Sequence, residues 1–421
     1  MNVDNHQASI TVRPEWALIG YLWVCYVLNH ADRQVVYTLF PILQSEFGLS
    51  DAMLGMTGAL FLWVYGLSSP VAGVLGDRWR STRVVTGSLM IWSFLTLLTG
   101  FAPNGSSLLV LRALLGISES LFMPAAFALI ANAHSPAGRS KAISLFATSQ
   151  LVGVALGGSL SGWLAERFHW RIAFWALGAV GMLFAIPLWR FLRGVPASFL
   201  SRGTASRADA KSFFALLLIP SLRVVTVFVA VATFGLYLVY TWLPTFLHDK
   251  FGLGLAHAGF EASVYPQIGT ALGLLTGGML ADKYYARTHA ARFWIILAAL
   301  CTAGPSIVLL GHLSTLASVR LAAMAFGFFS GWVVANQAAS AFDVVPAGHR
   351  ASTIGVLNLV GCTVSGFAPF LGGLARRTIG VDKVMVMTGG LYLLTGAFVL
   401  FGILRYFRAD HERALLSQPR P

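Results

Sequence analysis

The sequence Gly73-Val74-Leu75-Gly76-Asp77-Arg78 ends one long apolar stretch, and it recurs as Gly278-Met279-Leu280-Ala281-Asp282-Lys283 at the end of another. Each copy places small residues in the last apolar turns and an acid beside a base at the polar end. Small residues let two helices approach closely inside a membrane, and a charged turn can hold neighbouring helix ends together. We therefore predict a gate motif on the cytoplasmic side of a membrane protein, formed by Gly73, Asp77, Arg78, Arg83, Asp282 and Lys283.

Two further matches extend this repeat over both halves of the chain. Phe47-Gly48-Leu49 recurs as Phe251-Gly252-Leu253, and Arg112 and Arg320 lie 208 residues apart. Such agreement indicates a duplicated six-helix unit, and parallel repeats of this kind are an architecture of transporters. The longest polar stretch separates the copies, which predicts an N-terminal bundle, a cytoplasmic linker and a C-terminal bundle with a short tail over 1–192, 193–212 and 213–421.

The composition of the chain supports a membrane protein. Its 421 residues are 57% hydrophobic and 11% charged, whereas soluble domains are about 45–50% apolar and about 25% charged. This excludes a soluble enzyme and a disordered chain. A membrane-spanning helix needs about 20 apolar residues, and the sequence offers twelve such stretches: 16–39, 52–76, 83–102, 107–132, 141–165, 172–192, 221–247, 257–281, 293–312, 315–342, 351–375 and 384–405. We predict an all-α membrane protein with twelve transmembrane helices in two six-helix bundles related by pseudo-two-fold symmetry.

The positive charges lie mostly on one side of the predicted membrane. The formal net charge is +13, but most Lys and Arg residues fall in the segments on one side of the predicted membrane. Cytoplasmic loops carry such an excess, so we expect a multi-pass protein of the plasma (inner) membrane with both termini in the cytoplasm. The basic balance therefore does not indicate a nucleic-acid partner.

Charged residues inside two predicted spans are the strongest indication of function. Asp32 and Arg33 lie in the first span, and Arg112 and Glu119 lie in the fourth. Each charge costs about 2.5–3.5 kcal/mol at mid-membrane on insertion scales, so such residues are functional hypotheses by default. Arg112 and Glu119 are two turns apart on one helix face, with Gly116 leaving space between them. One hypothesis is that Asp32 and Glu119 exchange protons while an arginine holds an anion; the alternative is static buried salt bridges, such as Arg112–Glu119.

Other polar residues at helical spacing are candidates for the cavity wall. Gln150 and Asn358 each precede Leu-Val-Gly and lie 208 residues apart, and each is a candidate for ligand contact or for interhelical hydrogen bonding. The glycines that follow them are expected to serve close helix packing. His30 can titrate near neutral pH, which suits either a proton relay or a hydrogen-bonded cavity wall. Tyr65 is a weaker candidate.

These motifs resemble those of a known family. The gate motif in both halves is similar to that of the major facilitator superfamily. Asn29-His30-Ala31-Asp32-Arg33, the segment from Arg112 to Glu119, and Trp242-Leu243-Pro244 resemble its anion:cation symporters. The resemblance implies symport of a small organic anion, a sugar acid or another carboxylate, driven by protons or alternatively by sodium. It assigns proton coupling to Asp32 and Glu119, and substrate contacts to Arg33, Tyr65, Gln150 and Asn358. From the charge and titration arguments above, we also expect Arg112 and His30 in the substrate site.

The chain departs from this family at two places. His30 replaces the usual Tyr, and Ser120-Leu121 replaces the usual Ala-Pro after the glutamate. Both leave the coupling acids intact and bear on the identity of the substrate. Spinster-type exporters of lysolipids and other amphiphiles share the Asn-x-x-Asp-Arg and Trp-Leu-Pro motifs, and they are the alternative within transporters.

An integral-membrane enzyme is the alternative from another class. The sequence contains neither the HExxH pattern of zinc proteases nor the GxSxG nucleophile elbow, so we expect no enzyme and no cofactor. Cys25, Cys301 and Cys362 lie far apart in apolar stretches without CxxC spacing, which predicts reduced, buried thiols and no metal site. The expected partners are a small organic anion, protons or sodium, and the lipid bilayer, with the protein acting as a monomer.

Overall fold

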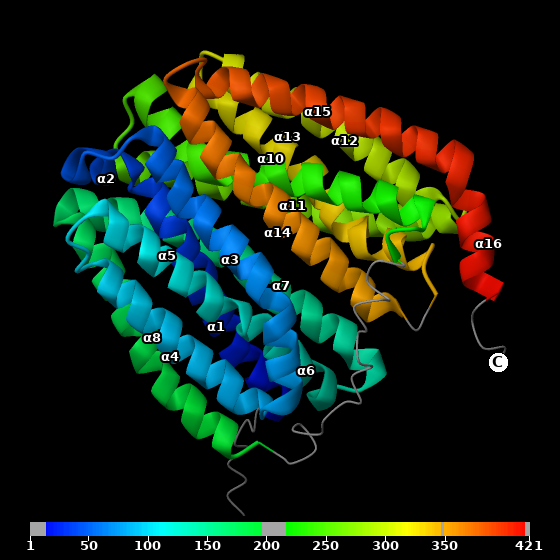
Figure 1. Cartoon of the computed structure of the whole chain (residues 1–421), viewed down its shortest axis with the longest axis horizontal. Coiled ribbons are helices and arrows are strands. Elements are labelled where there is room, and N and C mark those ends of the chain that lie inside the picture. Colours follow the sequence, from blue (N-terminus) through cyan, green and yellow to red (C-terminus); the bar gives the residue numbers. More distant parts are fainter. Residues whose placement is uncertain (1–13, 196–215, 347–348, 417–421) are drawn as a thin grey trace, which may run out of the picture.

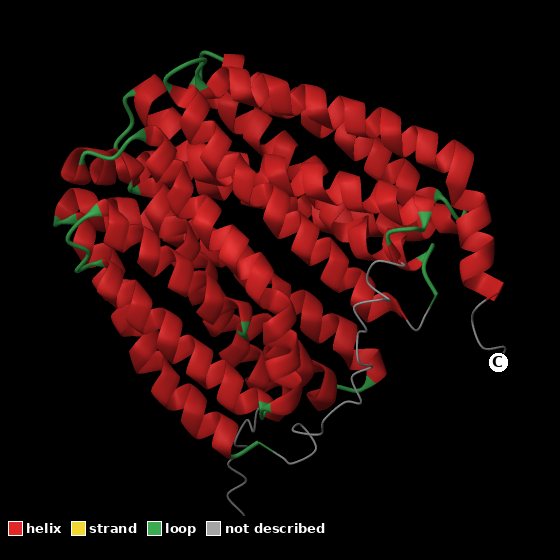
Figure 2. Ribbon diagram, in the orientation of Figure 1, coloured by secondary structure: helices red, strands yellow, loops and turns green. Residues whose placement is uncertain are grey.

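A computed structural model describes residues 14–195, 216–346 and 349–416, and helices make up almost all of this part of the chain (Figure 2). The predicted linker, 193–212, lies mostly outside the described residues. The helices form two groups that lie side by side along the same general direction (Figure 1).

The first group contains the N-terminal half of the chain. Its helices are α1 (Pro14–Thr38), α2 (Phe40–Phe47), α3 (Asp51–Arg78), α4 (Ser81–Thr99), α5 (Gly105–Ser120), α6 (Phe122–Ala133), α7 (Pro136–Arg167) and α8 (Trp170–Arg193). The helices α5 and α6 together occupy the fourth predicted span, which is interrupted at Leu121. Pro124 lies just beyond the interruption and cannot donate a backbone N–H to the preceding turn, which explains the break beside Glu119.

The second group contains the C-terminal half. Its helices are α10 (Pro220–Phe251), α11 (Leu255–Tyr285), α12 (Ala291–His312), α13 (Leu316–Phe342), α14 (Arg350–Arg376), α15 (Val381–Gly402), the π-helix η3 (Ile403–Phe407) and α16 (Arg408–Leu416). The π-helical turn joins α15 to α16 without a loop.

The twelve-helix prediction is confirmed. In the described part of the chain, ten segments are long and apolar enough to cross a membrane. The helices α1 and α11 are 25 and 31 residues long but less apolar. The first carries the charged Asn29–Arg33 stretch, and the second is rich in glycine. Both pack against other helices, α1 on α7 and α11 on α13, and complete the set of twelve.

The two bundles repeat the same helix pairs. In the N-terminal bundle α1 packs on α7, α3 on α5 and α4 on α8; in the C-terminal bundle α10 packs on α14, α11 on α13 and α12 on α15. Each pair in one bundle is the counterpart of a pair in the other, in the same chain order. The Phe-Gly-Leu repeat has a structural reason, because Gly48 and Gly252 end α2 and α10 in the left-handed conformation, with φ of 61° and 62°. Glycine adopts this conformation without strain.

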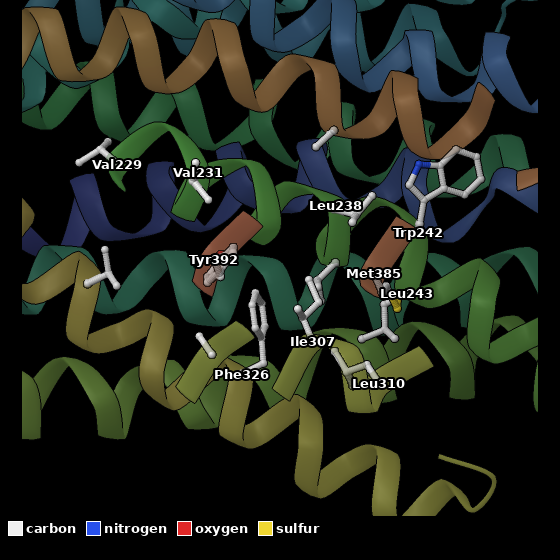
Figure 3. Close-up of a cluster of buried hydrophobic side chains, with 14 of the residues drawn as sticks. Val229, Val231, Leu238, Trp242, Leu243, Ile307, Leu310, Phe326, Met385 and Tyr392 are labelled. Atoms are coloured by element: carbon white, nitrogen blue, oxygen red, sulfur yellow. The ribbon is translucent and has the colours of Figure 1, made fainter. Parts of the chain in front are cut away.

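Two clusters of buried apolar side chains form the core, and the larger one extends from the C-terminal bundle to α1, α2 and α8 of the N-terminal bundle. In the C-terminal bundle, Leu238, Trp242, Ile307, Phe326 and Tyr392 gather between α10, α12, α13 and α15 (Figure 3). The core of the N-terminal bundle is built around large buried rings on α3, α4, α6 and α7: Phe61, Trp92, Phe122 and Phe146. Close packing of this kind, rather than exclusion from water, holds helices together in a membrane.

The bundles meet through α3 with α14 and through α7 with α11. We call the side on which α1 ends and α3 begins the distal side, and the side of Pro14 and Leu416 the terminal side. The close contacts lie towards the distal side: Gly58 packs on Pro369, and Gly162 packs on the backbone of Leu255 and Ala256. Asp51 at the start of α3 forms ion pairs with Arg376 and Arg377 at the end of α14. The halves are therefore closed against each other on the distal side.

Candidate functional site

The charged residues predicted inside the membrane lie together in the N-terminal bundle. Asp32 and Arg33 are in the last turns of α1, and Arg112 and Glu119 are on α5. All four are buried, with exposed fractions of 3%, 9%, 2% and 0%. Buried ionised groups are stable only when they are paired or hydrogen-bonded, so their partners define what this site can do.

Arg33 and Glu119 form the one ion pair within this cluster in the described residues. The Arg33 Nε donates to Glu119 Oε2 over 2.7 Å. The guanidinium also lies over the rings of Phe61 and Tyr65, at 5.0 and 4.8 Å from their centroids. The predicted alternative, a salt bridge between Arg112 and Glu119, is wrong, because Glu119 is paired with Arg33 of α1 instead.

Arg112 carries a positive charge that pairs with no carboxylate among the described residues. Its Nε and Nη1 donate to the backbone carbonyls of Thr57 and Asp32, both over a long 3.4 Å, and its Nη2 has no hydrogen-bond partner within the part of the chain that the structure describes. Its guanidinium lies 4.8 Å from the centroid of the Phe61 ring, so Phe61 contacts both arginines. Arg112 is therefore a buried cation without a counterion among the described residues.

Several unsatisfied polar atoms of the bundle belong to residues of this cluster and its neighbours on α1. Asp32 Oδ1, Glu119 Oε1, His30 Nε2 and both amide atoms of Asn29 are buried without a hydrogen-bond partner in the described part of the chain. Most buried polar atoms in proteins are paired. Such a concentration marks a place where protons, water or a ligand complete the bonding.

The C-terminal bundle shows how the fold neutralises the equivalent arginine. Arg320 binds Glu261 through two contacts, Nε to Oε2 at 2.7 Å and Nη2 to Oε1 at 2.5 Å. Glu261 lies 204 residues after Thr57, the same offset that relates the Phe-Gly-Leu copies. Where α11 supplies a carboxylate, α3 supplies a threonine whose carbonyl makes the long contact with Arg112. The unpaired charge of Arg112 is therefore specific to the N-terminal bundle.

The remaining predicted binding residues are distributed around the cluster. Tyr65 contacts Arg33, and His30 packs edge-on against Tyr26, with ring centroids 4.5 Å apart. Gln150 on α7 is half-buried and Asn358 on α14 is exposed. The structure brings neither amide into contact with the arginines.

The glycines beside these residues serve helix packing. A Cβ at Gly157 would lie 2.7 Å from the backbone of Ala31, and one at Gly153 would lie 2.8 Å from His30. The space expected at Gly116 is filled, because a Cβ there would lie 2.7 Å from the carbonyl oxygen of Phe61. Gly116 lets α5 pack against α3 and offers no room for a ligand.

Two neighbours of Arg33 are absent from the sequence prediction. Phe61 lies one turn before Tyr65 on α3, and Cys362 lies one turn after Asn358 on α14, near Arg33. Their spacing from predicted residues is the signal that could have found them. The expectation of three buried thiols is wrong: Cys25 is buried, Cys362 is half-buried and Cys301 is exposed.

The gate motif is described only in part. The side chains of Gly73, Asp77 and Arg78 lie outside the described residues. Asp282, with a side chain 81% exposed, lies 4.0 Å from Arg292, and Lys283 is also exposed. Arg292 is held mainly by Asp343, at 2.5 Å. Burial raises the pKa of the Asp343 carboxyl, and the Arg292 guanidinium opposes that rise.

Comparison with known families decides the class of this site. The model of the Major Facilitator Superfamily matches residues 22–369, from α1 into α14. The chain belongs to the Major Facilitator Superfamily. Proteins of this superfamily are membrane transporters and not enzymes, and the resemblance drawn from the two gate-motif copies is confirmed.

Relatives within the Major Facilitator Superfamily cover nearly the whole chain. A hexuronate transporter of Bacillus subtilis (strain 168) is 25% identical over 418 residues, 96% of this chain and 96% of that protein. A protein of Mycolicibacterium smegmatis described as an MFS-type efflux pump is 28% identical over 420 residues, 97% of this chain and 96% of that protein.

A solved structure shares the fold. It is the crystal structure of a bacterial homologue of the human lysosomal transporter Spinster, in an inward-facing and occupied conformation. It matches with a TM-score of 0.80 and 21% identity, over 95% of this chain and 99% of that chain. Both groups that the sequence resembles, sugar-acid transporters and spinster-type transporters, are therefore among its neighbours.

Proposed function

We propose that this protein is a secondary active transporter that couples the movement of protons to symport of a small organic anion, a sugar acid or another carboxylate, by alternating access. One observation carries the proposal: within the described residues, Arg112 is a buried cation without a paired carboxylate, next to Asp32, whose Oδ1 has no hydrogen-bond partner there, and to the Arg33–Glu119 ion pair. A site of this kind has places for both an anion and protons.

Binding of the anion and binding of the proton are coupled through Arg33, which contacts Glu119. A substrate carboxylate that binds Arg33 takes the guanidinium away from Glu119. A buried carboxylate that has lost its cation is more stable when it binds a proton. Anion binding therefore favours proton uptake at Glu119, and Asp32 beside Arg112 offers a second site where the same exchange takes place.

The relatives support an organic anion as the substrate class. Hexuronate is a sugar carboxylate, and the transporter of that substrate matches this chain from end to end. Tyr65 and Phe61 provide flat surfaces beside the arginines, and Gln150 and Asn358 are amides that can bind sugar hydroxyls. His30 adds a ring nitrogen without a partner near Arg33, and we assign it to the substrate site as well.

Export of a lysolipid or another amphiphile is the second candidate. The relative described as an efflux pump favours outward transport in this lineage. An amphiphile requires a largely apolar site, whereas the buried groups around Arg112 are charged. The integral-membrane enzyme is excluded by membership in a superfamily of transporters.

The proposed orientation places both termini in the cytoplasm of a plasma-membrane protein. Arginines and lysines gather on the terminal side, among them Arg80, Arg83, Lys141, Arg190 and Arg193. Cytoplasmic loops carry such an excess. We propose a monomer as the functional unit, because each chain contains both bundles and a complete cluster.

Transport currents of the reconstituted protein test this proposal. Liposomes that contain the protein are exposed to sugar acids, aromatic acids, dicarboxylates and lysolipids at an imposed pH gradient, with and without sodium. We expect a current for a sugar acid or another carboxylate that follows the proton gradient and does not require sodium. A response to lysolipids alone would instead identify the amphiphile exporter, and a strict requirement for sodium would overturn proton coupling.

A further inference from the structure

A cavity on the N-terminal bundle is lined, among the described residues, by side chains other than those of the charged cluster. It has a volume of about 470 Å³, and its lining includes Trp79, Arg80, Arg83, Gly87, Ile91 and Leu121. Trp79 and Ile91 are 57% and 51% exposed, so the cavity opens on the outer surface of the bundle. The proposed transport mechanism uses none of these residues.

The cavity follows one face of α4. Its residues on and just before this helix fall at positions 80, 83, 84, 87, 88 and 91, the spacing of a single helical face. Eleven residues of helix span about 16 Å at about 1.5 Å per residue. That length matches half of a hydrocarbon core about 30 Å thick. The groove thus runs from the end of α4 on the terminal side to about the middle of the membrane.

The two ends of the groove differ in polarity. Arg80 and Arg83 stand at the terminal end and are exposed, and neither guanidinium forms an ion pair within the described residues. Trp79 lies beside them, in the position where tryptophans mark the membrane interface. The deep end is formed by Ile91 and Leu121, and the hydroxyl of Ser88 is already bonded to the carbonyl of Val85 over 3.2 Å.

Gly87 keeps the middle of the groove open. A Cβ at this position would meet nothing within 4 Å, so the glycine is not required for close approach to another helix. Because Gly87 has no side chain, the backbone of α4 lines the groove between the end with the arginines and the apolar end.

We propose that this groove binds an anionic phospholipid from the leaflet on the terminal side. The phosphate lies between Arg80 and Arg83, which are suited to charge-assisted hydrogen bonds with phosphate oxygens, and one acyl chain lies along α4 over Gly87. Basic clusters at the end of a membrane helix attract anionic headgroups. The charge at the mouth, the apolar depth and the length of one leaflet together select a lipid over a soluble anion. Arg83, predicted as part of the gate motif, then contacts a lipid.

Lipid binding to defined variants tests the proposal. The purified full-length chain is titrated with phosphatidylglycerol and with phosphatidylcholine, and bound lipid is counted by native mass spectrometry. We expect Arg80→Gln with Arg83→Gln to weaken phosphatidylglycerol binding by roughly thirtyfold, because two interfacial charges are lost, and to leave phosphatidylcholine binding nearly unchanged. The matched control is Arg190→Gln with Arg193→Gln, which removes two exposed arginines on the same side from α8, outside the groove.

A third variant separates the acyl chain from the headgroup. Gly87→Leu adds a side chain whose Cβ meets nothing within 4 Å and leaves both arginines in place, so we expect its thermal unfolding to match that of the unaltered protein. We expect it to weaken binding of both lipids. Three results would each overturn the proposal: equal effects of the two arginine pairs, unchanged lipid binding in Gly87→Leu, or binding of inorganic phosphate as tight as that of phosphatidylglycerol.

Discussion

At the scale of single residues, the contrast between Arg112 and Arg320 shows that the fold does not require an unpaired arginine at this position. Both occupy equivalent positions in their bundles, but Arg320 has two contacts with Glu261 and Arg112 has only long contacts with carbonyl groups. The same fold therefore tolerates a fully paired arginine at this position. The unpaired one is retained for another reason, which we assign to anion binding.

Substitution of Arg112 tests this assignment. We expect Arg112→Gln to weaken binding of the transported anion by at least about tenfold, since a hydrogen bond to a charged group contributes about 1.5–3 kcal/mol. Binding is measured by quenching of tryptophan fluorescence or by calorimetry on the purified protein. The control is Arg320→Gln, which should lower the melting temperature because Glu261 loses its cation, while affinity for the anion stays the same. Equal loss of affinity in both variants would contradict the assignment.

Substitution of Arg33 tests its two proposed contacts, with Glu119 and with the anion. Arg33→Ala removes the partner of Glu119 and a proposed ligand for the substrate, so we expect transport and anion binding to be lost together. Arg33→Lys keeps the charge but not the planar guanidinium, and it should restore only part of the affinity. Full affinity in Arg33→Ala would remove the electrostatic basis for an anionic substrate.

The sequence predicted which residues form the cluster but not how they pair. The cost of a charge in a membrane identified Asp32, Arg33, Arg112 and Glu119 without any coordinates. The pairing of Glu119 with Arg33 depends on how α1 and α5 are rotated against each other, and helical spacing within one helix does not contain that information. Phe61 escaped prediction for the same reason, because an apolar ring gains its role only from the arginines packed on it.

At the scale of helices, glycines decide how closely the two bundles approach. Gly55 on α3 faces the carbonyl of Pro369 on α14, and a Cβ there would collide with it.

The sequence predicted all twelve spans to within a few residues because long apolar stretches are a strong signal. The interruption at Leu121 and the short helices α2 and α16 were not predicted, since they depend on local capping and on packing.

A bulky residue at the interface of α3 and α14 tests the role of this glycine. Gly55→Leu should destabilise the closed distal side by about 1–3 kcal/mol or more, the usual cost of overpacking, and lower the melting temperature. Gly390→Leu on α15 is the control, because a Cβ there would meet nothing within 4 Å. Thermal unfolding in detergent measures both, and equal melting temperatures would contradict the packing argument.

At the scale of the whole molecule, an ionic cluster joins the two bundles on the distal side. Arg376 binds Asp51 at 2.6 Å and Asp249 at 2.5 Å, and Arg377 binds Asp51 at 3.0 Å. The internal repeat predicted two bundles, but not which of their ends would be in contact, because the contacts between bundles change as a transporter opens and closes.

We interpret the ionic cluster of Asp51, Asp249, Arg376 and Arg377 as the latch that holds the distal side shut.

Removal of the latch should open the distal side. Asp51→Asn takes the shared carboxylate from two arginines, which should shift the balance towards the distally open state by about 2 kcal/mol, or roughly thirtyfold in population ratio. Spin labels at the exposed distal positions Ser45 and Thr315 report the separation of the bundles by pulsed electron resonance. The control is Glu46→Gln, which breaks the ion pair with Arg171 inside the N-terminal bundle. Unchanged distances in Asp51→Asn would refute the latch.

We propose that the buried acids of the N-terminal bundle carry protons for an anionic substrate. The most direct test is uptake of the identified anion into liposomes under an inward proton gradient, compared for the unaltered protein, Asp32→Asn and Glu119→Gln. We predict that both variants lose accumulation driven by the gradient, because an amide cannot take up and release the proton, while exchange of external for internal substrate continues. Accumulation at the unaltered level in either variant would contradict the proton role of that acid.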